Sequence, residues 1–225
     1  MLAGLSEADR SALLALGSVR RHAAGSVLMH EGDPGADLHV MLHGCVKVVG
    51  DTDDGRTTLL AVRVPGDLIG ELAALDGRPR SATVIAAAAT MTRSVDHDTF
   101  EAFLAQRRGA ATVVQRSITT KLREATRFRT ELGGASVPVR IVRVLHHLAQ
   151  LHGRAVDGGL LVDVPLSQPE IAALAGVSAP GARRALTDLR RRDIVSTGYR
   201  RLLVRDPAAL GALAADTGRE PGAHQ

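Results

Sequence analysis

The feature that most constrains this chain is a series of short apolar segments between residues 25 and 95 that end at Gly, Asp or Pro roughly every ten positions. The segments read SVLMHEG, DLHVMLHGCVKVVG, TTLLAVRVPG and ATVIAAAATMTRSV. This spacing is typical of an antiparallel sandwich or barrel. The stretch DTDDGRT, with Asp54-Gly55 at its tip, predicts a hairpin turn.

Helical patterns flank this β region. Residues 1–20 predict a short amphipathic helix with Ser6 as N-cap and inward-facing Leu13, Leu14 and Leu16. Residues 98–132 predict a long helix with one heptad seam, and its positions are Ala111, Val114, Ile118, Lys121, Ala125, Phe128 and Leu132. A seam of this length favours pairing with a second copy of the helix in a homodimer. Packing onto the chain's own β region is the alternative.

Gly133-Gly134 stops this helix and predicts a hinge at 133–136. Ser136 and Pro138 suit the start of the next helix, which is expected over 137–151. A short β segment, two short helices and a hairpin follow, and residues 213–225 are expected to be disordered. The expected organisation is therefore 1–97 (β domain with the N-terminal helix), 98–132 (long helix), 133–136 (hinge), 137–212 (C-terminal domain) and 213–225 (tail).

The stretch LSQPEIAALAGVSAPGARRALTDLRRRDIV carries the signals of a helix-turn-helix. Ser167 and Glu170 form a capping box, Gly176 ends the first helix, and Ser178 caps the second. The second helix turns Ala182, Leu186 and Leu189 to the core, whereas Arg183 and Arg184 project from its early turns. Such a helix reads DNA in the major groove, where Arg binds a guanine edge or a phosphate.

Charge supports DNA as the partner. Residues 1–132 hold 16 Lys/Arg and 16 Asp/Glu, whereas residues 133–225 hold 12 and 8, so the whole net charge of +4 lies in the second part. Between Ser178 and Arg205 there are 8 Arg and 2 Asp. A concentrated basic segment is an electrostatic footprint for nucleic acid. Arg200 and Arg201 flank the tip of the final hairpin near Gly198, which predicts a wing that contacts phosphate.

The stretch GELAALDGRPRSATV combines groups that suit one phosphate. Arg80 offers a cationic fork, Ser81 a hydroxyl, and a short helix around Leu72 its N-terminal N–H groups. Glu71 would repel a bare phosphate, but it suits a ligand that also carries a hydroxyl, such as a cyclic nucleotide. An Arg–Glu salt bridge on a loop is the alternative.

With its flanks, GDLIGELAALDGRPRSATV closely resembles the phosphate-binding cassette of cyclic-nucleotide-binding domains. The order of elements over residues 5–205 resembles the Crp–Fnr (cyclic-AMP receptor) family of bacterial transcription regulators. The resemblance implies an α+β fold: a jelly-roll-like β-roll that binds a cyclic nucleotide, a long dimerisation helix and a winged helix-turn-helix. It implies that Glu71 binds the ribose 2′-hydroxyl and that Arg80 and Ser81 bind the cyclic phosphate, near the backbone of Gly70 and Leu72.

The resemblance also assigns residues on the long helix and in the recognition helix. It places Lys121 near the phosphate and the ribose-binding Glu, and it places Ala125 and Thr126 against the base, where Ala125 lacks the family's hydroxyl. After Ser178, family members that read the best-known operator carry Arg-Glu-Thr, whereas this chain has Ala179, Pro180 and Gly181. Arg184, with Arg183, then remains for base contact.

Other chemistries find less support. His39 and His43 would share one face of a strand, but no third metal ligand is evident. The lone Cys45 excludes an internal disulfide and a Cys-ligated cluster. Few aromatic residues are present for base stacking, and no catalytic constellation, signal peptide or membrane span is recognised. We expect no enzyme activity, no cofactor and no metal.

The sequence therefore predicts a cytoplasmic, homodimeric transcription regulator that binds double-stranded DNA and a cyclic nucleotide, with cAMP as the expected effector. The family resemblance adds RNA polymerase as an expected partner. The alternative is a regulator of the same architecture that acts without nucleotide or senses another effector.

Overall fold

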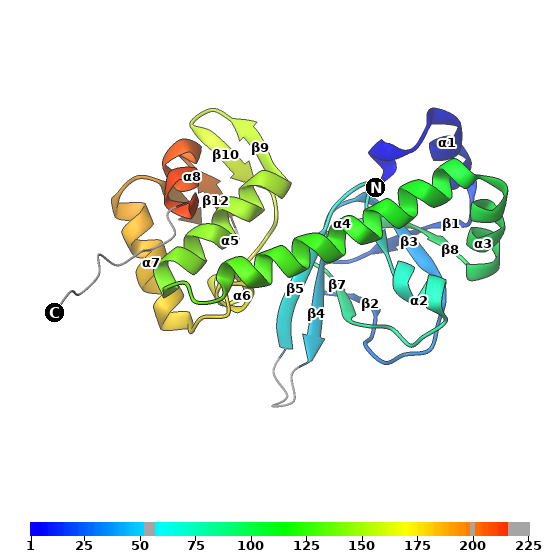
Figure 1. Cartoon of the computed structure of the whole chain (residues 1–225), viewed down its shortest axis with the longest axis horizontal. Coiled ribbons are helices and arrows are strands. Elements are labelled where there is room, and N and C mark those ends of the chain that lie inside the picture. Colours follow the sequence, from blue (N-terminus) through cyan, green and yellow to red (C-terminus); the bar gives the residue numbers. More distant parts are fainter. Residues whose placement is uncertain (52–56, 199–200, 216–225) are drawn as a thin grey trace. The chain divides into compact units, whose positions relative to one another are not determined.

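The computed structural model describes residues 1–51, 57–198 and 201–215 (Figure 1). The chain forms two compact units, one spanning Met1–Ala125 and one beginning at Thr126. We refer to them as the first and the second unit.

The first unit is built on two four-stranded antiparallel sheets, which confirms the β-roll expected for residues 25–95. One sheet has the order β1 (Ser18–His22), β8 (Thr90–Val95), β3 (Leu38–His43), β6 (Leu68–Ile69). The other has the order β2 (Val27–Met29), β7 (Thr83–Ala86), β4 (Val46–Asp51), β5 (Thr57–Arg63). Strands β4 and β5 pair as the predicted hairpin. Its tip, Asp54-Gly55, lies outside the described residues.

The helices of the first unit differ from expectation at one point. The short helix η1 (Leu2–Gly4) and α1 (Glu7–Ala15) open the chain, and the Ser6 side chain caps α1 by accepting from the Asp9 backbone N–H, as predicted. The predicted helix 98–132 is instead two helices, α3 (His97–Gln106) and α4 (Arg108–Leu132). They are separated at Arg107, whose backbone leaves helical geometry and whose side chain binds Asp9 at 2.9 Å.

The start of α4 packs into the core of its own unit. Val114 is 1% exposed and belongs to a cluster with Leu13, Phe100 and Phe103, and Ile118 packs against it. The N-terminal part of the heptad seam therefore has an intramolecular partner, as in the alternative interpretation. Further along α4, Leu122 is 67% exposed and Ala125 is exposed. The side chain of Phe128 is outside the described part.

The second unit is a winged helix-turn-helix, as expected. Its helices are α5 (Val137–His152), α6 (Gln168–Leu174), α7 (Ala179–Arg191) and α8 (Pro207–Ala215). One antiparallel sheet has the order β11 (Val195–Gly198), β12 (Arg201–Val204), β10 (Gly159–Val162), β9 (Gly153–Val156). Helix α8 corrects the expected start of a disordered tail, because residues 213–215 are helical and Leu210 anchors the helix with 0% exposure. Residues 216–225 lie outside the described part.

The helix is interrupted where the hinge was predicted. Helix α4 ends at Leu132, Gly134 has the left-handed φ of +73°, and α5 begins at Val137. The two units nevertheless divide between Ala125 and Thr126, within α4, instead of at 133–136. The last turns of α4 belong with α5, where Arg140 donates to the Leu132 carbonyl at 2.9 Å.

Candidate functional site

The cassette predicted to bind phosphate borders a pocket of about 100 Å³ in the first unit. The expected short helix is present as α2 (Glu71–Asp76). It begins after β6, and the loop that follows it returns to β7. The pocket is lined by side chains or backbone of Met29, Val48, Arg63, Leu68, Ile69, Gly70, Glu71, Leu72, Ala73, Arg80, Ser81, Ala82 and Val84. The structure thus brings the expected ligand-binding residues Gly70, Glu71, Leu72, Arg80 and Ser81 around one cavity.

The backbone and the close packing at position 70 both require glycine. Its φ is +77°, and a Cβ atom there would lie 2.6 Å from an Arg80 guanidinium nitrogen and 2.7 Å from the Met29 methyl carbon. Glycine therefore permits both the turn into α2 and the close approach of Arg80.

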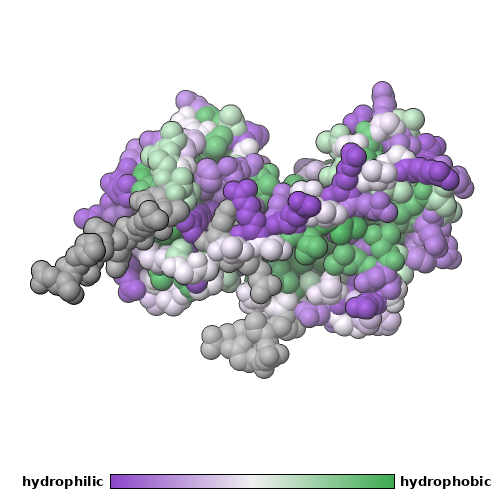
Figure 2. Space-filling view, in the orientation of Figure 1, coloured by the Kyte–Doolittle hydropathy of each residue, from purple (hydrophilic) through white to green (hydrophobic). Residues whose placement is uncertain are grey.

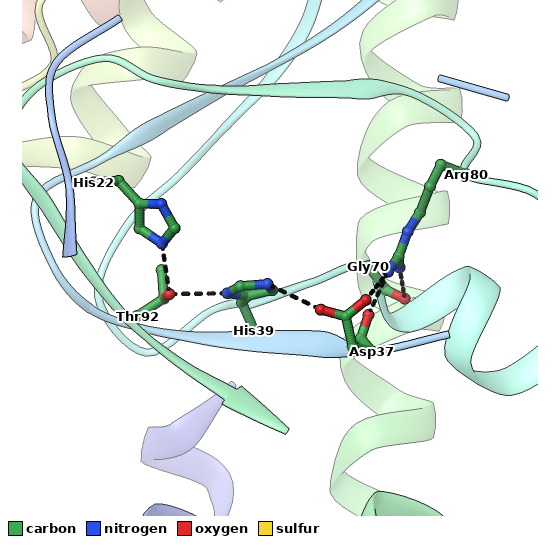
Figure 3. Close-up of polar contacts among 6 residues, drawn as sticks. All are labelled: His22, Asp37, His39, Gly70, Arg80 and Thr92. Atoms are coloured by element: carbon green, nitrogen blue, oxygen red, sulfur yellow. Dashed lines mark hydrogen bonds and ion pairs between the residues drawn. The ribbon is translucent and has the colours of Figure 1, made fainter. Parts of the chain in front are cut away.

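Arg80 is 6% exposed, and acceptors from two other segments hold its guanidinium (Figure 3). One terminal nitrogen donates to the Gly70 carbonyl at 3.2 Å. The other donates to the backbone carbonyl of Asp37 at 2.7 Å and to its carboxylate at 2.5 Å. These bonds use three of the five N–H groups of a guanidinium, so the Nε–H and one Nη1–H remain, on different edges of the group. Asp37 was not predicted from the sequence, although an acidic residue directly before β3 (Leu38–His43) was an available signal.

Glu71 forms a second ion pair in the same region. Glu71 is 8% exposed, and its carboxylate accepts from Lys121 of α4 at 2.8 Å; Lys121 also donates to the Leu68 carbonyl at 3.0 Å. The expected proximity of Lys121 to Glu71 is therefore present. The alternative Arg80–Glu71 bridge is not what forms, because each of the two residues has a different partner.

The other residues predicted to contact the ligand are more exposed to solvent than Glu71 and Arg80. Ser81 is exposed, and Leu72 is half-exposed at 45%. Ala125 and Thr126 are exposed on α4, and neither is among the described residues that line the pocket. A role of Ala125 and Thr126 against a base stays a prediction.

The two histidines of β3 do not share a face. His39 is buried and His43 is exposed, because a register shift between Met41 and His43 interrupts the pairing of β3 with β8. The predicted common orientation was wrong, since a bulge reverses the side-chain alternation that follows it. Among the residues that the structure describes, no group of three or more His, Cys, Asp and Glu side chains could hold a metal ion.

Helices α6 and α7 have the predicted caps. Ser167 and Glu170 form both bonds of the capping box, and Ser178 accepts from the Gly181 N–H at 3.3 Å. Gly176 has the left-handed φ of +60° that the turn needs. Along α7, Ala182, Leu186 and Leu189 are buried, whereas Arg183 and Arg184 are exposed.

The start of α7 explains one departure from the family pattern. Gly181 is buried, and a Cβ atom at this position would lie 3.1 Å from Val137 of α5 and 3.2 Å from the Ser178 hydroxyl. This position therefore packs against α5 and offers no side chain to a base. Arg184, three residues further along α7, is exposed and can offer its side chain to a base.

The wing is the hairpin of β11 and β12, in which Gly198 pairs with Arg201. Arg201 is exposed beside the tip, and the expected phosphate contact Arg200 lies outside the described residues. Of the two arginines predicted to contact phosphate from the wing, Arg201 is therefore the one whose position the structure describes.

We expect Arg184→Ala and Arg201→Ala to weaken DNA binding in different ways. Arg184→Ala should relax base preference at one position per half-site, because a bidentate base contact is worth about 1–3 kcal/mol of discrimination. Arg201→Ala should weaken all sequences alike and reduce the salt slope by roughly one unit. Binding to operator variants at several salt concentrations measures both effects. The exposed Arg108→Ala in the first unit is the control, and an Arg184 variant that lowers only the salt slope would refute the base contact.

Among the described residues, no helix is both long enough and apolar enough to cross a lipid bilayer.

Comparison with known proteins agrees with this division into two parts. A model of the cyclic nucleotide-binding domain matches residues 19–107, and a model of the Crp-like helix-turn-helix domain matches residues 139–213. The CRP-like cAMP-activated global transcriptional regulator of Mycobacterium tuberculosis is 31% identical over 186 residues, which cover 83% of each chain. The transcriptional regulator LdrP of Thermus thermophilus is 29% identical over 193 residues, which cover 85% of this chain and 94% of LdrP.

Solved structures show the same fold. FixK2 from Bradyrhizobium japonicum superposes with a TM-score of 0.77 at 22% identity, over 89% of this chain and 98% of FixK2. A CRP-family transcriptional regulator from Thermus thermophilus superposes with a TM-score of 0.68 at 26% identity, over 87% of this chain and 96% of that regulator.

Proposed function

The chain belongs to the Crp–Fnr family of DNA-binding transcription regulators, and we propose that it acts as a homodimer that binds cAMP and thereby binds operator DNA more tightly. The observation that carries the proposal is the pair of ion pairs at one pocket, Arg80–Asp37 and Glu71–Lys121. Arg80 offers its positive charge and an unused N–H group to a cyclic phosphate, and Glu71 keeps acceptor capacity for a ribose hydroxyl.

The choice of cAMP rests on similarity. The Mycobacterium tuberculosis relative is named as cAMP-activated, and the aligned part covers 83% of both chains. We carry this effector over to the present chain as the proposed ligand, with Ser81, Leu72, Ala125 and Thr126 as its further expected contacts.

The proposed dimer interface uses apolar side chains that the first unit leaves exposed. Figure 2 shows apolar surface on the first unit beside α4. Leu122 on α4 and Leu72 and Leu75 on α2 are exposed by 67%, 45% and 46%. Burial of such side chains against a second copy is favourable, and a two-fold dimer matches operators built of two half-sites. As a transcription regulator the dimer would act in the cytoplasm with RNA polymerase as a further partner.

A calorimetric titration with cAMP and, separately, with cGMP tests the proposal. We expect one cAMP to bind per chain and cGMP to bind more weakly, and sedimentation of the same sample should give the mass of two chains. A monomer, or a chain that binds neither nucleotide, would contradict the proposal.

A second candidate is a regulator of this family that acts without nucleotide or senses another effector. Two observations favour it. The Asp37 carboxylate already accepts a hydrogen bond from the Arg80 guanidinium. The pocket volume of about 100 Å³ is also smaller than the roughly 300–1,000 Å³ typical of ligand sites. DNA binding that is tight without nucleotide and unchanged by cAMP would support this candidate.

A further inference from the structure

A chain of hydrogen bonds and ion pairs leads from Arg80 across the β-roll to a histidine near the surface (Figure 3). Asp37 binds Arg80 through one carboxylate oxygen and lies 3.3 Å from His39 Nε2 through the other. His39 Nδ1 is 2.8 Å from the Thr92 hydroxyl, which is 3.0 Å from His22 Nε2. His39 and Thr92 are buried, with 6% and 0% exposure, whereas His22 is half-buried.

The partners fix the direction of these bonds when both histidines are neutral. A carboxylate only accepts, so His39 Nε2 carries the hydrogen and donates to Asp37. His39 Nδ1 then accepts from the Thr92 hydroxyl, and the Thr92 oxygen accepts from His22 Nε2–H. Every group in the chain has a partner in this arrangement.

One additional proton can also be accommodated. If solvent protonates His22 at Nδ1, the hydrogen on its Nε2 can pass to Thr92, and the Thr92 hydrogen can pass to His39 Nδ1. His39 then holds both ring hydrogens and carries the positive charge, while His22 is neutral again and accepts from Thr92. The bonds reverse their direction without any change of partner.

The charges around His39 explain when this proton would bind. Burial lowers the pKa of His39, the Asp37 carboxylate raises it, and His22 and Arg80 lower it. Burial, followed by Arg20, lowers the pKa of His22. Without ligand the Asp37 charge is shared with Arg80, so the neutral form of His39 is favoured.

A cyclic phosphodiester at Arg80 changes this balance, a step that rests on the proposed function. The ligand brings one negative charge to a site whose two ion pairs are already neutral. Arg63 also lines the pocket, but its charge is permanent and does not vary with pH. Competition for Arg80 leaves the Asp37 carboxylate less neutralised, and His39, whose Nε2 lies 3.3 Å from that carboxylate, is the histidine placed to take up a compensating proton.

We propose that binding of a cyclic nucleotide at Arg80 is coupled to uptake of a proton by His39, with Asp37 as the link between them. His39 and Asp37 are then positioning residues that make the affinity of the pocket depend on pH. Because the bound state holds more protons than the free state, affinity rises as the pH falls. Lowering the pH by one unit toward the range in which histidines titrate should tighten binding about two- to tenfold.

Calorimetry of the full chain with cAMP in two buffers of different ionisation enthalpy at one pH tests the coupling. The slope of the observed enthalpy against buffer enthalpy counts the protons taken up, and for the wild type we expect uptake between about 0.2 and 1 proton per site. His39→Gln should reduce the uptake to near zero. The exposed His43→Gln on the same strand is the matched control and should keep the wild-type value. Asp37→Asn removes the negative charge that connects Arg80 with His39, and it should also abolish the proton uptake.

The two proposals fail in different ways. Wild-type protein that binds cAMP with the same enthalpy in both buffers, or a His39 variant that takes up as many protons as the wild type, overturns the coupling alone. Wild-type protein that gives no binding in either buffer overturns the nucleotide assignment and the coupling with it.

Discussion

Replacing Arg80 by alanine is expected to weaken cAMP binding roughly tenfold to more than a hundredfold. A hydrogen bond to a charged group is worth about 1.5–3 kcal/mol, and each 1.4 kcal/mol is about a factor of ten in the dissociation constant. Arg80 is buried, and three of its N–H groups are held by Gly70 and Asp37, so water cannot easily substitute for its charge. Titration calorimetry with cAMP measures the loss.

The same loop supplies a matched control for Arg80. Arg78 is exposed two positions earlier, so Arg78→Ala removes an equal charge and should leave affinity near the wild-type value. Arg80→Ala also leaves the Asp37 carboxylate without its partner, and circular dichroism must show that the variant is folded. Arg80→Lys keeps the charge but not the planar fork, and it should still bind more weakly than the wild type. Unchanged affinity in a folded Arg80→Ala variant would refute the pocket.

Local sequence signals predicted the parts of this fold that depend on local physics. The capping box of Ser167 and Glu170 lies within four consecutive residues, and the structure forms it as expected. The same holds for the Ser178 cap, the left-handed Gly134 and Gly176, and the cassette that groups Gly70, Glu71, Arg80 and Ser81 at one pocket. In each case the interacting groups are close in sequence, or one backbone conformation requires a particular residue.

The features that were missed depend on distant partners. Asp37 and Arg80 are far apart in the chain, and only the return of the cassette loop toward the start of β3 brings them together. The break between α3 and α4 lies at Arg107, whose side chain binds Asp9 on α1. The bulge that separates His39 from His43 arises from pairing with β8. No periodicity within one segment contains these contacts.

The seam of α4 shows that an apolar pattern does not identify the surface it packs against. The heptad spacing predicted one continuous apolar stripe, and Val114 and Ile118 of this stripe pack on the chain's own β-roll. Lys121 is bound to Glu71, and beyond it Leu122 and Ala125 are exposed. An apolar stripe in the sequence indicates only that one face of the helix favours burial, because the hydrophobic effect is non-directional. Which surface covers that face is determined by the tertiary structure.

We expect cAMP to tighten operator binding about 5- to 150-fold, the range of couplings of roughly 1–3 kcal/mol. Helix α4 is continuous from Lys121, which binds the pocket residue Glu71, to Leu132 at the hinge. A ligand that binds one arrangement of this helix better than another shifts the equilibrium by that difference in affinity. Operator affinity measured without nucleotide and with saturating cAMP gives the factor, and linkage requires operator DNA to tighten cAMP binding by the same factor.

Thr126→Ala tests whether the helix carries this coupling. If Thr126 holds the base, the variant should lose part of the coupling as well as part of the cAMP affinity. Thr119 is an exposed threonine on the same helix that donates to the Gln115 carbonyl, so Thr119→Ala is the control and should retain both. Weaker cAMP binding with an unchanged coupling factor would mean that Thr126 contacts the ligand equally in both states. Equal operator affinity of the wild type with and without cAMP would instead favour a regulator whose DNA-binding form is already set without nucleotide.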